Sequence, residues 1–117
     1  MTDAAHILVV DDDREIREAL RTALEDEGFT VAVAANGAEA IAKMEERRPR
    51  VVLLDLNMPI VDGWEVLDHM RADPSLDDVR VCVCSAVADV RAAREADVVL
   101  VKPFGIAAVL GVVSDLA

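Results

Sequence analysis

The chain has 117 residues, 54% of them hydrophobic, and this predicts one globular domain with a filled core over residues 1–117. A formal net charge of −11 at pH 7 makes binding to nucleic acid phosphates unfavourable. No apolar run approaches the ~18 residues of a membrane span, and the first residues carry no export signal. We therefore expect a cytoplasmic protein with neither a membrane nor a nucleic acid as partner.

Five short apolar segments predict β-strands. Most are continuous runs of Val, Leu and Ile rather than an alternation of apolar and polar residues. Continuous runs are typical of strands with both faces covered, as in a parallel sheet between layers of helices. The expected strands lie at residues 6–10, 29–34, 51–55, 79–84 and 98–101.

Helical patterns separate these segments. Asp13 is a suitable N-cap for the first helix and Gly28 a suitable end, while Pro49 and Pro74 stop the second and third. The fourth helix is expected to be short and rich in alanine. The helices should lie between Asp13 and Gly28, at about 36–47, from 63 to before Pro74, and at about 86–95 and 105–116.

Repeated strand–helix units predict a three-layer α/β/α sandwich with right-handed crossovers. No linker, repeat or low-complexity stretch divides the chain. Cys82 and Cys84 share one face of an expected strand with roughly parallel side chains, so we expect buried thiols rather than a disulfide or a zinc site.

Polar residues end four of the five expected strands: Asp11 and Asp12, then Asp55, Ser85 and Lys102. Each alone has an ordinary explanation as a helix cap or a turn residue. Doubly wound sheets, however, bind ligands at the carboxyl ends of their strands. The strand order 2-1-3-4-5 would make these four strands neighbours and leave the second strand outside, which favours a shared site.

Phosphoryl transfer onto a carboxylate suits these groups. Three close carboxylates repel each other, and Mg²⁺ (or Mn²⁺), which prefers oxygen ligands, relieves that repulsion. With Asp11 and Asp12 on the metal, Asp55 is left as the nucleophile. The Lys102 ammonium and the Ser85 hydroxyl would then meet oxygens of the phosphoryl group.

The sequence resembles the receiver domains of two-component response regulators over nearly its whole length. The motifs that carry the resemblance are ILVVDDD (7–13), VVLLDLNMPIVDG (51–63), VCVCSA (81–86) and VKPF (101–104). The resemblance implies a flavodoxin-like fold with a five-stranded parallel sheet of order 2-1-3-4-5. It also implies a phosphoprotein, not a conventional enzyme, that receives its phosphoryl group from a sensor histidine kinase or a histidine phosphotransfer protein with Mg²⁺.

The same resemblance implies a role for each site residue. The phosphoacceptor would be Asp55, also a metal ligand, and the bond before Pro103 would be cis. The other implied roles are metal ligands for Asp11, Asp12 and the backbone carbonyl of Asn57, a switch hydroxyl for Ser85, and a phosphate partner for Lys102.

The sequence departs from the family pattern near the switch. Val99 stands where the family usually has an aromatic residue, and the stretch from Ser85 to Lys102 is shorter than usual. Val87, two residues after Ser85, has no side-chain hydrogen-bonding group for the water that hydrolyses an aspartyl phosphate. We therefore expect slow self-dephosphorylation and an altered coupling to output.

Two alternatives stay open from the sequence. The first is a phosphohydrolase with an aspartyl-phosphate intermediate, although Asn57 stands where such enzymes often place a second carboxylate. The second is a receiver fragment of a larger regulator or hybrid kinase. The length excludes a DNA-binding domain beside the receiver within this chain.

Overall fold

The computed structural model describes residues 5–56, 58, 62–85 and 90–117, and its elements lie within a few residues of those expected. The 3₁₀-helix η1 was not predicted. In the described part of the chain, no helix has the length and apolar character needed to cross a membrane. The elements are β1 (His6–Val10), α1 (Arg14–Asp26), β2 (Thr30–Ala34), α2 (Gly37–Glu46), β3 (Val51–Asp55), α3 (Gly63–Ala72), η1 (Pro74–Leu76), β4 (Arg80–Ser85), α4 (Val90–Glu95), β5 (Val98–Val101) and α5 (Ile106–Leu116).

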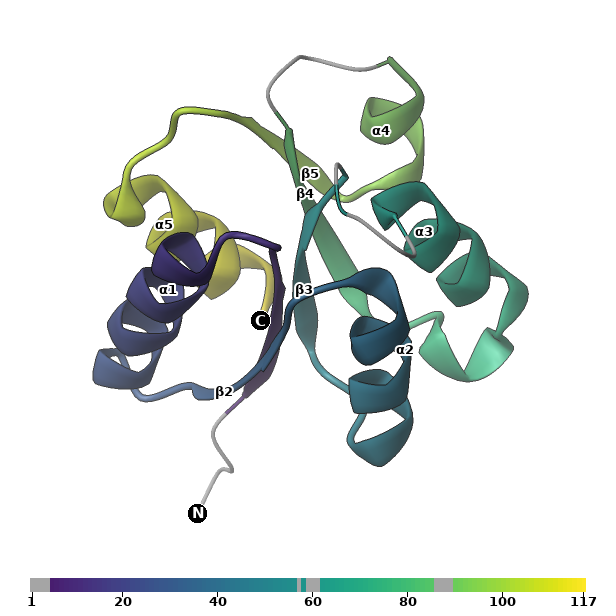
Figure 1. Ribbon diagram of the computed structural model, residues 1–117, viewed down its shortest axis with the longest axis horizontal. Coiled ribbons are helices and arrows are strands. Elements are labelled where there is room, and N and C mark those ends of the chain that lie inside the picture. Colours follow the sequence, from purple (N-terminus) through teal and green to yellow (C-terminus); the bar gives the residue numbers. More distant parts are fainter. Residues whose placement is uncertain (1–4, 57, 59–61, 86–89) are drawn as a thin grey trace.

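The strands form one five-stranded sheet in the order β2-β1-β3-β4-β5, in which every neighbouring pair is parallel. This is the predicted order. The helices lie in two layers, with α1 and α5 on one face of the sheet and α2, α3 and α4 on the other (Figure 1). The chain therefore has the expected three-layer α/β/α architecture with the flavodoxin-like strand order.

Each central strand buries both of its faces. Leu8 and Val10 pack in the core beneath α2 and α3, while Ile7 and Val9 pack in the core beneath α1 and α5. The same alternation continues along β3 and β4. Two-sided burial explains why these strands read as continuous apolar runs.

The two cysteines lie on one face of β4, in the core beneath α1 and α5. Both are buried and neither is in a disulfide, as predicted. The hydrogen bond with the Cys82 thiol and the burial of the site raise the pKa of the Cys84 thiol. Cys84 is therefore a protonated core side chain rather than a reactive thiolate.

The helix ends follow the signals in the sequence. The Asp13 carboxylate accepts a hydrogen bond of 2.9 Å from the backbone N–H of Glu15 and so caps α1. Gly28, just after α1, has a φ of +95°, a conformation that favours glycine. The cap holds the start of α1 next to the end of β1, where the candidate site begins.

Candidate functional site

The carboxyl ends of four adjacent strands carry the polar residues that the sequence singled out. Asp11 follows β1, Asp55 and Ser85 end β3 and β4, and Lys102 follows β5. Register places Asp55 beside Cys84, the residue before Ser85, and places Ser85 beside Val101. The parallel sheet therefore brings residues that are 91 positions apart in sequence to one edge.

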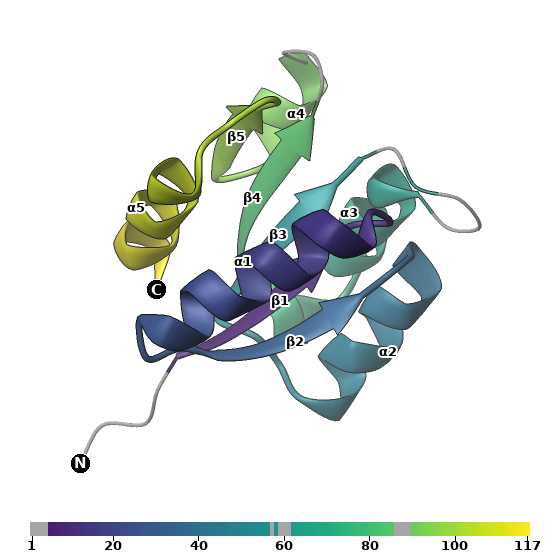
Figure 2. The same cartoon turned by 60° about the vertical axis from the view of Figure 1, so that its left-hand side comes forward.

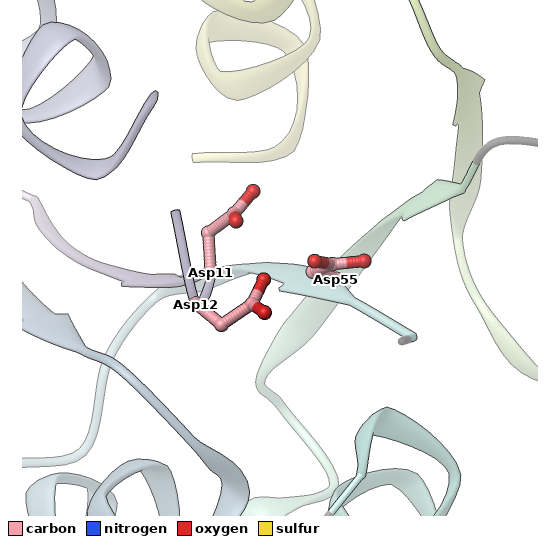
Figure 3. Close-up of side chains that lie close together, drawn as sticks. All are labelled: Asp11, Asp12 and Asp55. Carbon is pink, nitrogen blue, oxygen red and sulfur yellow. The ribbon is translucent and has the colours of Figure 1, made fainter. Parts of the chain in front are cut away.

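Three carboxylates gather at this edge. Asp11, Asp12 and Asp55 each present an oxygen within 4.8 Å of the others. Figure 3 shows the three side chains gathered at the ends of their strands. Asp11 and Asp55 are only 3% and 5% exposed, whereas Asp12 is exposed. The backbone of Asp11 is held beside β2, because its N–H donates a hydrogen bond to the Ala34 carbonyl at 3.1 Å. Two of the three charges therefore stand where water solvates them poorly.

Lys102 lies between the two buried carboxylates. Its Nζ is 3.4 Å from Oδ2 of Asp11 and 3.5 Å from Oδ2 of Asp55. Burial alone would lower the pKa of Lys102, but the carboxylates of Asp11 and Asp55 outweigh it and raise this pKa above its ordinary value. Lys102 therefore stays protonated at neutral pH and offers a fixed positive charge.

The backbone around Lys102 is also fixed. Its N–H donates a hydrogen bond of 2.6 Å to the carbonyl of Ser85, which ties the end of β5 to the end of β4. The peptide bond between Lys102 and Pro103 is cis, as expected. The Ser85 side chain lies at this junction and is 3% exposed.

The carboxylates fit a magnesium ion. Oxygens on opposite corners of a magnesium octahedron lie about 4.2 Å apart, because each Mg–O distance is about 2.1 Å. The 4.8 Å within which the three oxygens lie exceeds this only slightly, so small side-chain rotations close the site. One lysine does not neutralise three carboxylates, and a divalent cation supplies the missing charge. The exposed side of Asp12 leaves room for the waters that Mg²⁺ retains.

The structure describes only one of the three remaining residues that the sequence singled out. Asn57, expected to offer a backbone carbonyl to the metal, and Val87 both lie outside the described residues. Val99 is half-buried in β5, pairs in register with Val83 and packs against the core beneath α2, α3 and α4. Its strand is separated by β4 from β3, the strand that Asp55 ends.

The role of Gly63 was not predicted from the sequence, although Gly63 is the last residue of the motif VVLLDLNMPIVDG (51–63). Gly63 begins α3, and its N–H donates a hydrogen bond of 3.1 Å to the carbonyl of Leu56. A Cβ at this position would lie 2.5 Å from the backbone oxygen of Asp55 and 2.6 Å from Cα of Leu56. The start of α3 therefore rests directly on the backbone of Asp55, and only glycine permits that approach.

The response regulator receiver domain family matches residues 7–114, and the chain belongs to this family. It is a receiver domain of a two-component system rather than a conventional enzyme. Asp11, Asp12 and Asp55 form its acidic phosphorylation pocket, and such a triad is typical of a Mg²⁺ site.

Individual relatives agree with this assignment. Transcriptional regulatory protein PrrA of Mycobacterium tuberculosis is 44% identical over 115 residues, which cover 94% of this chain and 48% of PrrA. The chain thus spans about half the length of these curated relatives. Chemotaxis protein CheY4 of Vibrio cholerae has a TM-score of 0.89 at 29% identity, covering 97% of this chain and 99% of CheY4.

A structure of response regulator protein TrrA of Thermotoga maritima bears on the cofactor, because it was solved in complex with Mg(2+)-BeF. It has a TM-score of 0.85 and 32% identity, covering 97% of this chain and 99% of TrrA. A relative of the same fold thus binds Mg²⁺, the cation that the carboxylates of this chain fit.

We predict that Mg²⁺ raises the melting temperature of the protein, because the cation relieves the repulsion among the three carboxylates. At a concentration of a hundred times Kd, the free energy of unfolding should rise by about 2.7 kcal/mol. The Asp12→Ala variant should lose most of this shift and be more stable than wild type without metal, because one repelling charge is gone. Thermal unfolding with Mg²⁺ and with a chelator measures both effects.

The matched control is Asp13→Ala. Loss of the N-cap of α1 should lower stability by about 1 kcal/mol, yet the Mg²⁺ shift should remain. If the metal-free Asp12→Ala protein were less stable than wild type, the repulsion argument would be wrong.

We predict that Gly63→Ala slows phosphorylation about tenfold or more, because a misplacement near 1 Å at a reacting group can lower rates roughly a hundredfold. A new methyl group would push the start of α3 away from the backbone of Asp55. The rate of phosphorylation by a small phosphodonor, measured on protein shown to be folded by circular dichroism, tests this. Gly111→Ala is the control, since a Cβ there meets nothing within 4 Å. A wild-type rate in folded Gly63→Ala would show that α3 does not position Asp55.

Proposed function

We propose that Asp55 accepts a phosphoryl group from the phosphohistidine of a sensor histidine kinase or a histidine phosphotransfer protein. The observation that supports this is the setting of Asp55 at the end of buried β3. Its carboxylate lies 3.5 Å from the Lys102 ammonium and within 4.8 Å of oxygens of Asp11 and Asp12. Of the three carboxylates, Asp55 belongs to the middle strand, between the acids after β1 and the groups that end β4 and β5.

The reaction exchanges one bond for another. An oxygen of Asp55 attacks phosphorus, the bond from phosphorus to the histidine nitrogen breaks, and the departing imidazole keeps the electron pair and takes a proton from solvent. Lys102 then shifts its ammonium from the carboxylate toward a phosphoryl oxygen, and the Ser85 hydroxyl donates to another. Bound Mg²⁺ would be held by Asp11, Asp12, Asp55 and the backbone of Asn57, and would neutralise charge on the phosphoryl oxygens.

The protein is proposed to store the phosphoryl group rather than to turn over a substrate. A phosphohydrolase with the same intermediate would need a base for the attacking water, and Asn57 offers no carboxylate. Val87 offers no side-chain hydrogen bond either. The aspartyl phosphate should therefore persist long enough to act as a signal.

The output is proposed to be a change in binding to other proteins in the cytoplasm. The names of the longer relatives include a transcriptional regulatory protein and a DNA-binding response regulator. A net charge of −11 opposes direct contact of this domain with nucleic acid. If the domain serves a larger regulator, it acts there as the phosphorylated input.

We predict that a small phosphodonor with Mg²⁺ adds one phosphoryl group to the wild-type protein and none to Asp55→Asn. Asparagine keeps the shape of the side chain but has no nucleophilic carboxylate. Intact-mass measurement detects the addition. Asp62→Asn is a control of the same chemistry, because Asp62 caps α3 and lies outside the triad. An equal mass gain in the Asp55→Asn variant would show that another residue is the phosphoacceptor.

The switch is proposed to work without a moving side chain at position 99. Val99 is half-buried against the core cluster that includes Val81 and Val83, and a β-branched side chain is stiff about χ1. Two distinct states are needed before a ligand can shift a population, and a single valine rotamer offers none. The change on phosphorylation should therefore concentrate at Ser85 and in residues 86–89, which lie outside the described part of the chain.

We predict that beryllofluoride with Mg²⁺ slows amide hydrogen exchange at Ser85 and in residues 86–89 but leaves 98–101 unchanged. The Val99→Tyr variant, which restores an aromatic ring, should extend the change into β5. Exchange mapped by mass spectrometry on both proteins tests this. Large changes across 98–101 in the wild-type protein would mean that another residue carries the ordinary switch.

A further inference from the structure

A hollow of about 760 Å³ lies at the opposite edge of the sheet, where the strands begin. In Figure 2 the strand arrowheads point away from this edge, which is the end where the C-terminus lies. Backbone hydrogen bonds link the starts of three adjacent strands there. The N–H of Arg50 donates to the His6 carbonyl at 2.7 Å, and the N–H of Arg80 donates to the Arg50 carbonyl at 3.0 Å. Residues far apart in sequence thus form one continuous wall.

The hollow is basic although the chain is strongly acidic. Four of the chain's 12 lysines and arginines line it, and Asp78 is the one acidic side chain among the described residues of its lining. The lining side chains that carry charge or can titrate are those of His6, Arg47, Arg48, Arg50, Asp78 and Arg80.

Two of the arginines are already engaged. Arg48 donates a hydrogen bond of 3.0 Å to the carbonyl of Ser75, and Arg80 forms an ion pair of 3.2 Å with Asp97 while its side chain stays 58% exposed. Arg47 and Arg50 are exposed, and within the described residues neither guanidinium makes a hydrogen bond or ion pair. Their ten N–H donors and two charges are therefore available to a ligand.

The pKa of His6 depends on the charge in the hollow. Its ring is half-buried, with Nδ1 3.0 Å from the Thr30 hydroxyl oxygen. Burial and then the positive charge of Arg47 lower the pKa of His6. An anion bound beside Arg47 would offset that charge and change the environment of the ring.

We propose that this hollow binds a compact anion that carries two or more phosphate groups, a class that includes pyrophosphate and nucleoside diphosphates. Guanidinium groups match phosphate oxygens with paired hydrogen bonds, and Arg47, Arg50 and Arg80 lie around one space. A compact ligand is favoured because a duplex or an acidic protein would also meet the remaining surface of a chain with a net charge of −11. The proposal is independent of phosphorylation at Asp55.

The test is a titration of the full chain with pyrophosphate, without divalent cations and at constant ionic strength, followed by NMR. The His6 ring and Arg50 amide signals should shift and saturate, while the Asp11 and Asp55 amides should not. Arg47→Gln and Arg50→Gln should each weaken binding about tenfold, since a hydrogen bond to a charged group is worth roughly that factor. Arg14→Gln, at the opposite edge of the sheet, should leave binding unchanged and controls for net charge.

Parallel titrations identify the source of the phosphate groups. If ADP binds more tightly than pyrophosphate, the ligand is a nucleotide. If the two bind with equal affinity, the site recognises the phosphate groups alone. Both results support the site. Inorganic phosphate at matched ionic strength should bind more weakly, because it offers one group instead of two. The proposal would be overturned by any of three results. These are no saturable shift with pyrophosphate or ADP, unchanged affinity in both arginine variants, and tighter binding of a short DNA duplex.

Discussion

The repulsion among three carboxylates at one sheet edge is the constraint on which the rest of this molecule depends. Asp11 and Asp55 are 3% and 5% exposed, so bulk water screens their charges poorly. Lys102 partly offsets them, and it does so only because β5 ends where β1 and β3 end. The order of the strands, the tie between Lys102 and Ser85, and the cap on α1 all serve to hold this charged edge. The negative charge at this edge stays partly uncompensated until a cation binds. Metal binding and phosphorylation therefore both act on the charge of the same site.

The fold was largely predictable because its signals are local. Continuous apolar runs marked the strands, Asp13 marked the start of α1, and polar residues at the strand ends marked the site. The importance of Gly63 was not predictable in this way, because the requirement comes from the backbone of Asp55, eight positions earlier, and no periodic pattern records such an approach. The basic hollow was missed for a related reason. His6, the 47–50 segment and Arg80 look like scattered surface charges until the parallel sheet aligns their strand starts.

The edge strand β5 explains why phosphorylation is expected to act locally. It is tied at its start, where the Asp97 N–H donates to the Val81 carbonyl at 2.9 Å and the Val81 N–H donates to the Asp97 carboxylate at 2.8 Å. It is tied at its end by the hydrogen bond from Lys102 to Ser85. A strand held at both ends cannot slide without breaking these bonds. In the part of the chain that the structure describes, α4 has six residues and offers little helical surface beside β5 to reorganise.

The two edges of the sheet carry opposite charge, and their separation decides whether they influence each other. A five-residue strand such as β1 or β3 spans about 16 Å, whereas the Debye length is about 8 Å at physiological salt. Salt screens the exposed arginines at the other edge over that distance, and even at an effective dielectric constant of about 20 two unit charges about 16 Å apart interact by only about 1 kcal/mol. Charge added at Asp55 therefore has little effect on those arginines. Mechanical coupling would require β1 or β3 to shift, and the apolar side chains of both are almost wholly buried between two layers of helices. Densely packed strands of this kind do not deform gradually. The central strands thus fix both sites in place while keeping them separate, so that an anion at one edge and a phosphoryl group at the other can bind independently.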